Sequence, residues 1–263
     1  MLDDQTRADL VAQYEAVYAG AEPLVPPTQT FPQMEEADAY AIQQQFIANR
    51  VAEGAKIAGY KVGLTSKAMQ EFAGTTEPDF SALLDTMFIP EAAEIKAADW
   101  FDPLVEIEIA FVLKEALSGA NVTAVDVIRA TDFVLPAIEL VDFRIKRAMG
   151  MNFIDTVSDL AAVGAVIVGG NPIRLDDVDV RCVEGVLLKN DQEVERGLAS
   201  AVLGNPVNAV AWLARKLSSF GIGFKPGQLI LTGSFVRAVP VAAGDRIAAR
   251  YDTGFGDVNV DFV

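Results

Sequence analysis

Histidine is absent from all 263 residues of the chain. Its absence excludes catalytic triads that use imidazole, zinc sites built on histidine, and glutamate–histidine pairs that activate water. Any catalytic acid or base must therefore be a carboxylate, a lysine, a tyrosine or water.

Cysteine is almost as scarce, since Cys182 is the single one. One thiol cannot form an internal disulfide or a thiolate metal cluster, which fits a reducing compartment. The neighbours of Cys182 are apolar, so we expect it to fill space in the core.

Basic residues are also few: 21 Lys and Arg face 37 Asp and Glu, which leaves a formal charge of −16. Such a charge repels phosphate backbones and anionic membrane surfaces and argues against binding to nucleic acid or membrane. The first residues, MLDDQTRADL, lack the basic start and apolar run of a signal peptide. The chain also contains no run of about 18 apolar residues, the length that would span a bilayer. We expect a soluble cytoplasmic protein whose partner is a small molecule or a protein.

The first part of the chain has a helical pattern. Apolar positions recur at helical spacing over residues 3–19 and 36–53. The stretch between them, GAEPLVPPTQTFPQ, is rich in proline, which predicts an extended connector rather than a helix. We therefore expect an N-terminal helical arm over residues 1–56 and a main domain over residues 57–263.

From residue 57 onward short apolar runs replace the helical pattern. Two predicted helices interrupt these runs. One covers about 124–131, and the other begins with Asn205 as N-cap and Pro206 as its first residue. The segment KNDQE (189–193) is typical of a hairpin turn. The runs that predict strands are IAGYKVGLT, LVEIEIAFVL, FVLPAIELVD, AAVGAVIVGG, VEGVLLKND, QLILTGS, RIAARYD and VNVDFV. Strands with scattered helices favour an α+β fold with a rolled or barrel-like mixed sheet. No GxGxxG motif, phosphate-binding loop or internal repeat is present, so nucleotide chemistry is not expected.

The strand LVEIEIAFVL (104–113) carries two glutamates in an otherwise apolar run. Glu106 and Glu108 project from the same face of an extended strand, roughly 7 Å apart at the backbone. One interpretation is a half-buried strand whose polar face is wet, as is usual for charged residues. The other arises from Glu139, which interrupts the apolar run FVLPAIELVD in the same way. Three carboxylates in one cleft repel one another unless a cation joins them, and oxygen ligands select Mg²⁺ or Mn²⁺.

Several long motifs occur in one order along the chain. They are GYKVGLTSKAMQ (59–70), EPDFSALLDTMF (77–88), VEIEIAFVL (105–113), ATDFVLPAIELVDFR (130–144), FIDTVSD (153–159) and ILTGSFVRAVPVAAGD (230–245). Together they resemble the 2-keto-4-pentenoate hydratase branch of the fumarylacetoacetate hydrolase superfamily, from about residue 36 to the C-terminus.

The resemblance implies a helical arm packed on a catalytic mixed β-roll and assembly as a homo-oligomer. It also implies Mg²⁺ or Mn²⁺ held by Glu106, Glu108 and Glu139, with Lys61 and Asp79 as the acid/base pair. Taken alone, Lys61 could instead be a lysine at a strand edge with its amine in water, and Asp79 an ordinary turn-capping aspartate in a loop. In a site, burial and a nearby cation would lower the pKa of Lys61 toward a useful range.

The activity that the resemblance implies is metal-dependent hydration of a 2-hydroxydienoate, or its 2-oxo tautomer, from aromatic meta-cleavage. The C–C bond hydrolases of the superfamily use a glutamate–histidine pair, which this chain cannot supply. The 4-oxalocrotonate decarboxylases share the metal face but do not typically show the E-P-D stretch that stands here at 77–79. The sequence therefore favours a hydratase, with a decarboxylase as the alternative.

The choice of substrate depends on chain length. SKAMQ, EPDFSALLDTMF and SFVRAVP most resemble enzymes that convert 2-oxohept-4-ene-1,7-dioate, a seven-carbon diacid, to 4-hydroxy-2-oxoheptanedioate; the alternative is 2-hydroxypenta-2,4-dienoate, a five-carbon monoacid. Ser234 and Arg237 are the expected substrate-binding residues, and Arg237 would receive the second carboxylate in a forked contact. Arg237 could instead be a solvated arginine beside a glycine turn. Arg144 is a second candidate, more consistent with a structural role.

Two positions depart from the family pattern. Leu160 stands where asparagine usually follows Ser158 and Asp159, and Asp257 replaces a common serine in the last strand. If Leu160 faces the site, one hydrogen bond to substrate or water is missing, and the substrate is then a related ring-cleavage product.

A catalytically inert binding protein of the same fold is the non-enzymatic alternative. Its glutamates would form only a solvated face. The joint presence of Lys61, Asp79 and the three glutamates argues against this alternative. If the protein is an enzyme, a downstream aldolase is a further partner to test.

Overall fold

The computed structural model describes residues 1–263, with the exception of the side chains of Ala68 and Phe72. The helices are α1 (Asp4–Tyr18), α2 (Pro27–Thr30), α3 (Glu36–Ala52), α4 (Lys67–Ala73), α5 (Ala124–Ala130), α6 (Phe153–Ser158) and α7 (Pro206–Ser218). The strands are β1 (Ile57–Gly63), β2 (Asp79–Leu84), β3 (Phe88–Ile89), β4 (Glu94–Ile95), β5 (Leu104–Leu113), β6 (Thr131–Val141), β7 (Val163–Val168), β8 (Glu184–Lys189), β9 (Gln192–Leu198), β10 (Leu229–Leu231), β11 (Val239–Pro240), β12 (Arg246–Tyr251) and β13 (Gly256–Phe262).

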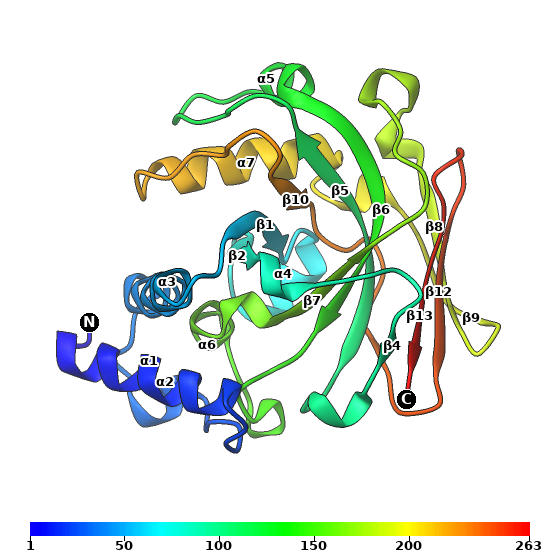
Figure 1. The fold of residues 1–263 in the computed structure, drawn as a ribbon. Helices are drawn as coiled ribbons and strands as arrows, with labels where there is room; N and C mark the ends of the chain where they lie inside the picture. Colours follow the sequence, from blue (N-terminus) through cyan, green and yellow to red (C-terminus); the bar gives the residue numbers. More distant parts are fainter.

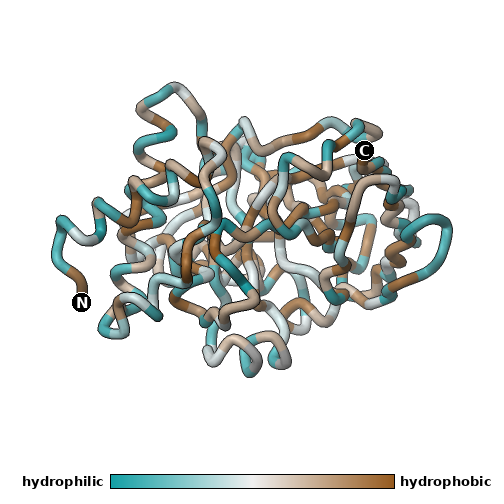
Figure 2. Tube along the Cα trace, turned by 90° about the horizontal axis from the view of Figure 1, so that it is seen from below, coloured by the Kyte–Doolittle hydropathy of each residue, from teal (hydrophilic) through white to brown (hydrophobic). Residues whose placement is uncertain are grey.

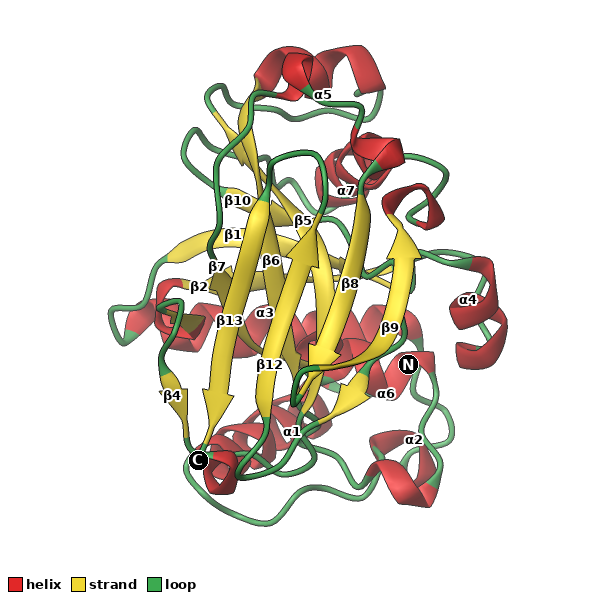
Figure 3. Cartoon of the chain, turned by 90° about the vertical axis from the view of Figure 1, so that its right-hand side faces the viewer, coloured by secondary structure: helices red, strands yellow, loops and turns green.

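The strands form two mixed sheets. The larger has eight strands in the order β2-β1-β10-β5-β6-β7-β3, with β11 paired to β5 off this path. The smaller has the order β4-β13-β12-β8-β9. Long β5 and β6 curl around the interior (Figure 1), and the five-stranded sheet lies across their outer side (Figures 1 and 3). The predicted α+β fold with a rolled mixed sheet is confirmed.

The core explains why β5 is so apolar. Ile107 and Ile109 are fully buried on one face of β5, and Ala110 is fully buried on the other. A strand at the centre of a sheet that is covered on both faces has to be hydrophobic on both. Hydrophobic segments gather in the interior of the molecule, while hydrophilic ones follow the outer turns (Figure 2). The two glutamates of β5 are therefore exceptions in a buried strand, and the wet-face interpretation does not hold for Glu108, which is 1% exposed.

Most predicted elements are present, and the differences have simple causes. The helix capped by Asn205 begins at Pro206 as expected, and the Asn205 side chain accepts a hydrogen bond from the Val207 amide. The loop assigned to Asp79 is wrong, because Asp79 is the first residue of β2. All six residues of β2 are buried, so the run DFSALL lacks the alternation that marks a half-buried strand. Strand β9 and helices α4 and α6 were likewise not predicted.

Two smaller expectations are also wrong. The proline-rich connector contains one helical turn, α2, which begins at Pro27; proline is tolerated there because the first amide of a helix has no internal partner. Cys182 is exposed rather than in the core, on the segment before β8. The apolar neighbours of Cys182 turn inward, since Val180 and Val183 are both buried.

The helical arm packs on the main sheet. A hydrogen bond of 2.8 Å joins the hydroxyls of Tyr14 in α1 and Ser158 in α6, and the Asp155 carboxylate accepts from the amide and hydroxyl of Thr28 in α2. The arm is thus fastened at several points, while the division of the chain at residue 56 stays a prediction. Among the residues that the structure describes, no helix is both long and apolar enough to cross a membrane.

A turn of unusual handedness follows α6. Leu160, Ala161 and Ala162 all have positive φ, at 53°, 50° and 59°. Non-glycine residues rarely adopt this conformation, and never favour it in succession. The buried guanidinium of Arg144 holds both ends of the turn: its Nε donates to Asp159 Oδ1 at 2.6 Å and its Nη1 donates to the Val163 carbonyl at 2.7 Å. Arg144 therefore has the structural role that was considered for it.

Candidate active site

Three glutamates meet on the large sheet. Glu106 of β5 lies directly opposite Glu139 of β6 in the antiparallel ladder. Glu108 lies two residues further along β5 and therefore on the same face. Each of the three offers one carboxylate oxygen within 4.8 Å of the others. We call Glu106, Glu108 and Glu139 the glutamate trio; their predicted convergence is what the structure has.

Lys61 joins the glutamate trio from a distant strand. It lies on β1, which is separated from β6 by β10 and β5. Its side chain is buried, and its Nζ lies 3.1 Å from Glu139 Oε1. The interpretation of Lys61 as a lysine with its amine in water is therefore wrong.

Asp79 lies beside Lys61. Strands β1 and β2 pair so that Asp79 faces Gly63, two residues after Lys61. A Cβ atom at Gly63 would lie 2.2 Å from Asp79 Oδ1 and 3.2 Å from Lys61 Nζ, so the absence of a side chain there makes room for both groups. The motif GYKVG contains the signal, since glycine inside a strand often marks a close approach.

Two backbone contacts hold the glutamate trio in place. The amide of Gly233 donates to Glu108 Oε2 at 2.7 Å. The hydroxyl of Tyr251, from the second sheet, lies 2.9 Å from the carbonyl of Glu108 and 2.7 Å from that of Ala137. Tyr251 therefore ties β5 to β6 beneath the trio. Neither Gly233 nor Tyr251 has a signal in the sequence, because each contact involves a backbone group that only the fold brings within reach.

Several carboxylate oxygens of the site lack a hydrogen-bond donor. Of the side chains that the structure describes, both oxygens of Glu139 and Oδ1 of Asp79 are buried without a partner in hydrogen-bond geometry, although the Lys61 ammonium lies 3.1 Å from Glu139 Oε1 as an ion pair. Buried polar atoms without partners are rare in folded proteins and require an explanation. A cation bound between the glutamates would supply the missing partner for Glu139.

The electrostatics of the site point the same way. Burial, followed by the charge of Glu139, raises the pKa of Glu106 to about 8. Burial and Glu139 also raise the pKa of Glu108 well above its ordinary value. Glu106 keeps partial access to solvent, which softens the effect there, whereas Glu108 and Glu139 are fully enclosed. Glu106 and Glu108 therefore hold protons more readily than usual, and three carboxylates this close have an excess of negative charge that a divalent ion would neutralise.

The two other titratable groups differ from each other. Burial raises the pKa of Asp79 to about 6, although the charge of Lys61 opposes this change. For Lys61, burial disfavours the charged form, but Glu139, Asp79 and the other glutamates together raise its pKa above the ordinary value. The expected lowering of the Lys61 pKa is therefore wrong, because the acids around the amine outweigh its burial.

The donor set fits a hard metal ion. All ligands that the glutamate trio offers are carboxylate oxygens, which Mg²⁺, Mn²⁺ and Ca²⁺ accept and for which softer metals have less preference. The trio also leaves room in the coordination shell of such an ion for water or a substrate oxygen, because three monodentate ligands are fewer than the six it requires.

The two residues predicted to bind substrate, Ser234 and Arg237, lie in different surroundings. Ser234 follows Gly233, and its hydroxyl lies 2.9 Å from the Val236 carbonyl and 3.3 Å from the Ile107 carbonyl. Arg237 has a side chain that is 86% exposed, and its Nε lies 3.1 Å from Glu195 Oε1 on β9. Ser234 is thus adjacent to a residue that contacts the trio, whereas Arg237 lies at the surface.

The two departures from the family pattern lie outside the glutamate trio. Leu160 is buried in the core with φ at 53°. Asparagine tolerates this conformation better than leucine does, so the usual asparagine has a backbone explanation. Asp257 Oδ2 lies 3.3 Å from Arg250 Nε in an exposed ion pair.

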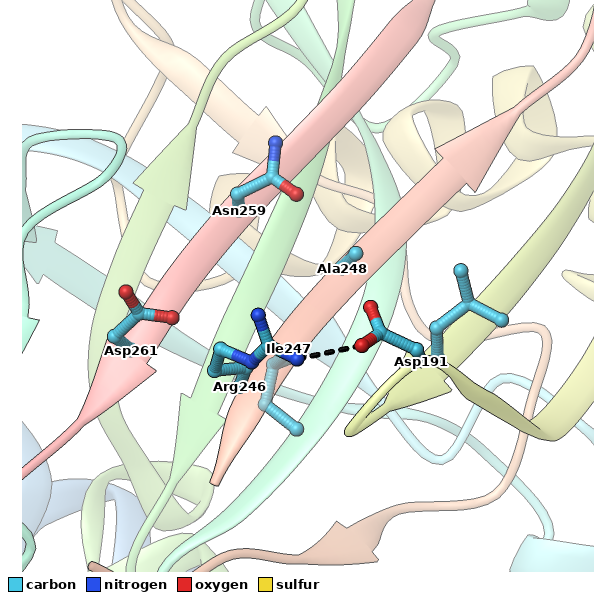
Figure 4. Close-up of a pocket in the computed structure, with 7 residues that line it drawn as sticks. Asp191, Arg246, Ile247, Ala248, Asn259 and Asp261 are labelled. Carbon is cyan, nitrogen blue, oxygen red and sulfur yellow. Dashed lines mark hydrogen bonds and ion pairs between the residues drawn. The ribbon is translucent and has the colours of Figure 1, made fainter. Parts of the chain in front are cut away.

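A shallow hollow of about 220 Å³ lies elsewhere, on the exposed face of the five-stranded sheet (Figure 4). An ion pair of 2.5 Å between Arg246 and Asp191 lies at its edge. Leu188, Ile247, Ala248, Asn259 and Asp261 complete its lining. None of the glutamate trio, Lys61 or Asp79 lines this hollow, so it is separate from the candidate active site.

The curled sheet and the convergent acids define the class of protein. The family model described as fumarylacetoacetate (FAA) hydrolase C-terminal matches residues 54–263, and the chain belongs to this family.

Within this family, the chain is similar to several enzymes of known name. The chain is 41% identical over 238 residues to 2-oxo-hept-4-ene-1,7-dioate hydratase of Escherichia coli, with 89% of each chain covered. It is 40% identical over 251 residues to 2-hydroxyhexa-2,4-dienoate hydratase of Comamonas testosteroni, with 95% of this chain and 94% of the relative covered. Among solved structures, 4-oxalocrotonate decarboxylase from Pseudomonas putida G7, complexed with magnesium and adipate, matches with a TM-score of 0.96 at 35% identity and covers 100% of this chain and 99% of that one.

Proposed function

We propose that the protein is a metal-dependent hydratase that adds water to a 2-oxoalkenoate, with 2-oxohept-4-ene-1,7-dioate as substrate and 4-hydroxy-2-oxoheptanedioate as product. The observation that carries the proposal is the convergence of the glutamate trio with Lys61 and Asp79. The 41% identity to a hydratase of that substrate supports the choice of reaction.

The glutamate trio would hold Mg²⁺, with Mn²⁺ as the alternative. When bound, such an ion would act as a Lewis acid and stabilise negative charge that develops on the oxygens of a 2-oxo acid. The relative that is complexed with magnesium supports this choice of metal.

Asp79 and Lys61 have complementary protonation states. A carboxyl group with a pKa of about 6 is mostly ionised at neutral pH, so Asp79 serves as the proton acceptor. Lys61 stays protonated, so it serves as the proton donor and as a fixed positive charge beside Glu139. Moving a proton from the C2 hydroxyl to the distal carbon gives a conjugated enone, and water then adds at C4.

The reaction is tested with purified protein and Mg²⁺ on an enzymatically generated 2-hydroxydienoate and, separately, on 4-oxalocrotonate, by ultraviolet absorbance and product mass. A product heavier by one water supports hydration. A product lighter by one carbon dioxide supports the second candidate, a 4-oxalocrotonate-type decarboxylase, which the TM-score of 0.96 to such an enzyme favours. If neither product forms and millimolar Mg²⁺ leaves the melting temperature unchanged, the inert binding protein is the better interpretation.

Chain length is tested through Arg237. We propose that Arg237 meets the second carboxylate of the seven-carbon diacid, which requires it to leave Glu195. Arg237→Ala is then expected to raise the KM for the diacid about tenfold, the effect of one charged hydrogen bond, and to leave the five-carbon monoacid unchanged. Arg246→Ala, which removes another exposed arginine from an ion pair, is the control. If Arg237→Ala handles the diacid normally, Arg237 has no such role.

We also propose that the protein forms a homo-oligomer in the cytoplasm and that its product passes to an aldolase.

A further inference from the structure

The strand that carries Asp79 is the last strand of its sheet. In the described strand order β2 pairs with β1 alone. The outward backbone groups of an edge strand have no ladder partner, and such a strand is held less firmly than a central one. The glutamate trio lies on central strands, so Asp79 is the candidate residue whose position depends most on what covers the edge.

Gln43 of α3 covers this edge. Its Nε2 donates to the Phe80 carbonyl at 2.9 Å and to the Val157 carbonyl at 2.9 Å. Gln43 is only 2% exposed. One carboxamide therefore joins three segments: helix α3 of the arm, strand β2 next to Asp79, and the end of α6.

The same helix holds β2 by a second contact. The ring of Tyr40, one turn before Gln43, stacks on that of Phe80 with centroids 4.7 Å apart and planes at 19°. Successive side chains of a strand point to opposite faces. Tyr40 and Gln43 hold the ring and the carbonyl of Phe80 from the side of the arm. Because Asp79 is the preceding residue of the same strand, these contacts also fix the direction in which its side chain points toward Gly63 and Lys61.

Few side chains hold Asp79. Its Oδ1 is buried and accepts no hydrogen bond from the side chains described, so its polar surroundings are the charge of Lys61 and the backbone amides of Gly63 and of Asp79 itself. Its carboxylate also fits only because Gly63 has no side chain. The placement of this group thus follows from the backbone of β2, and small shifts of that backbone move it relative to Lys61.

We propose that Gln43 is a positioning residue for Asp79. It does not touch the substrate; it fixes the edge strand so that the acid/base pair keeps its geometry. The inference rests on the proposed function for its catalytic meaning, since it assumes that Asp79 transfers protons.

The test is Gln43→Met, which keeps length and apolar volume but removes both donors. Because a displacement of about 1 Å can cost about 100-fold in rate, we expect kcat to fall between about 10-fold and about 100-fold while KM stays within about twofold. The melting shift caused by Mg²⁺ stays as in the wild type, because the glutamate trio is not touched. Gln43→Asn, which keeps the donors but shortens their reach, is expected to retain more kcat than Gln43→Met.

Two control variants separate positioning from general loss of stability. Tyr14→Phe removes the arm's hydrogen bond to Ser158 without touching β2. Gln45→Met alters an exposed glutamine on the same helix, which bonds only Asn49 among the described side chains. Both should keep the wild-type kcat. The proposal is overturned if Gln43→Met keeps kcat within about twofold, or if Tyr14→Phe at equal melting temperature loses as much.

Amide hydrogen exchange makes the outcome independent of the proposed reaction. Gln43→Met should speed exchange in residues 79–84 more than Tyr14→Phe does, because the edge strand is released locally. If the wild type is inactive, the proposed function fails while faster exchange in 79–84 still supports the role of Gln43 in fixing β2. Unchanged exchange there overturns the inference whatever the activity.

Discussion

The Nζ of Lys61 lies 3.1 Å from Oε1 of Glu139, although β10 and β5 separate the strands that carry them. The lysine side chain spans this distance because the sheet is strongly curled (Figure 1). The contact joins Lys61, a member of the proposed acid/base pair, to the glutamate trio, so the candidate site contains groups from both the centre and the edge of the sheet.

Replacing Lys61 by methionine is the first test of that connection. Lys61→Met keeps the apolar stem but removes the proposed proton donor, so we expect kcat to fall about 10²- to 10⁴-fold. The melting shift caused by Mg²⁺ should persist, because all three carboxylates remain. Lys67→Met, at an exposed position of α4, is the control. A Lys61→Met enzyme with more than about a tenth of the wild-type kcat would remove Lys61 from the mechanism.

A second prediction separates metal binding from folding. Glu108→Gln keeps an oxygen to accept from the Gly233 amide but removes one of the mutually repelling charges. We expect the metal-free variant to melt no lower than the wild type and to lose the stabilisation by Mg²⁺, which is about 2.7 kcal/mol at a concentration 100 times the Kd. EDTA should return the wild type, but not the variant, to a lower melting temperature. A Glu108→Gln protein that still responds to Mg²⁺ would contradict the assignment.

The third prediction concerns pH. The pKa of Glu106 is raised to about 8 from an ordinary value of 4.5, mainly by burial and then by Glu139. A carboxyl group whose pKa rises on folding contributes stability that is complete below its unfolded value and is lost as pH rises through its folded value. The metal-free protein should therefore melt at a lower temperature at about pH 8.5 than at about pH 6, and saturating Mg²⁺ should remove this decline because the ion replaces the protons. Glu106→Gln should make this decline smaller without abolishing it, because the pKa values of Glu108 and Asp79 are also raised. A decline as steep in Glu106→Gln as in the wild type would show that Glu106 does not contribute to it.

The fourth prediction concerns the space around Asp79. Gly63→Ala places a Cβ 2.2 Å from Asp79 Oδ1, so the carboxylate must move. We expect a loss of about 100-fold in kcat with the Mg²⁺ melting shift unchanged. Combining Gly63→Ala with Asp79→Asn should cost little more than Asp79→Asn alone, since both act on one group. Additive losses would show that Gly63→Ala acts by another route.

The left-handed turn gives a prediction about stability. Ala161 has φ at 50°, a conformation that costs an L-residue about 1–2 kcal/mol and glycine almost nothing. Ala161→Gly should therefore stabilise the protein by up to about 1 kcal/mol after the greater freedom of glycine in the unfolded chain is subtracted. Ala209→Gly, in the regular helix α7, should destabilise it by about 1 kcal/mol. Chemical denaturation measures both, and equal signs would contradict the role given to the turn.

The sequence predicts the parts of this fold that repeat locally. Alternating or continuous apolar runs located β5, β6, β8 and β12, and the spacing of two residues placed Glu106 and Glu108 on one face. The long motifs added Lys61 and Asp79 through resemblance to the family.

What the sequence did not predict depends on strand order and burial on both faces. Strand β2 has no polar face, so no alternating pattern marks it as a strand. The contact between Lys61 and Glu139 depends on the order of the strands, because β10 and β5 lie between the strands that carry the two residues. The raised pKa of Lys61 follows from the same convergence, because the acids that cause it come from β2, β5 and β6. The ion pair between Arg237 and Glu195 was not predicted, because Glu195 lies on β9, which no apolar pattern marks.

The strand order also divides the site into a fixed half and an exchangeable half. The glutamate trio sits on two interior strands that sheets and neighbours enclose, so substitutions there disturb the whole core. Asp79 sits at the rim, directly after a connection that can change length or composition without altering any glutamate. Variation in that connection should therefore shift Asp79 while leaving the glutamate trio as it is, so related proteins can diverge at this rim without rebuilding the centre of the sheet.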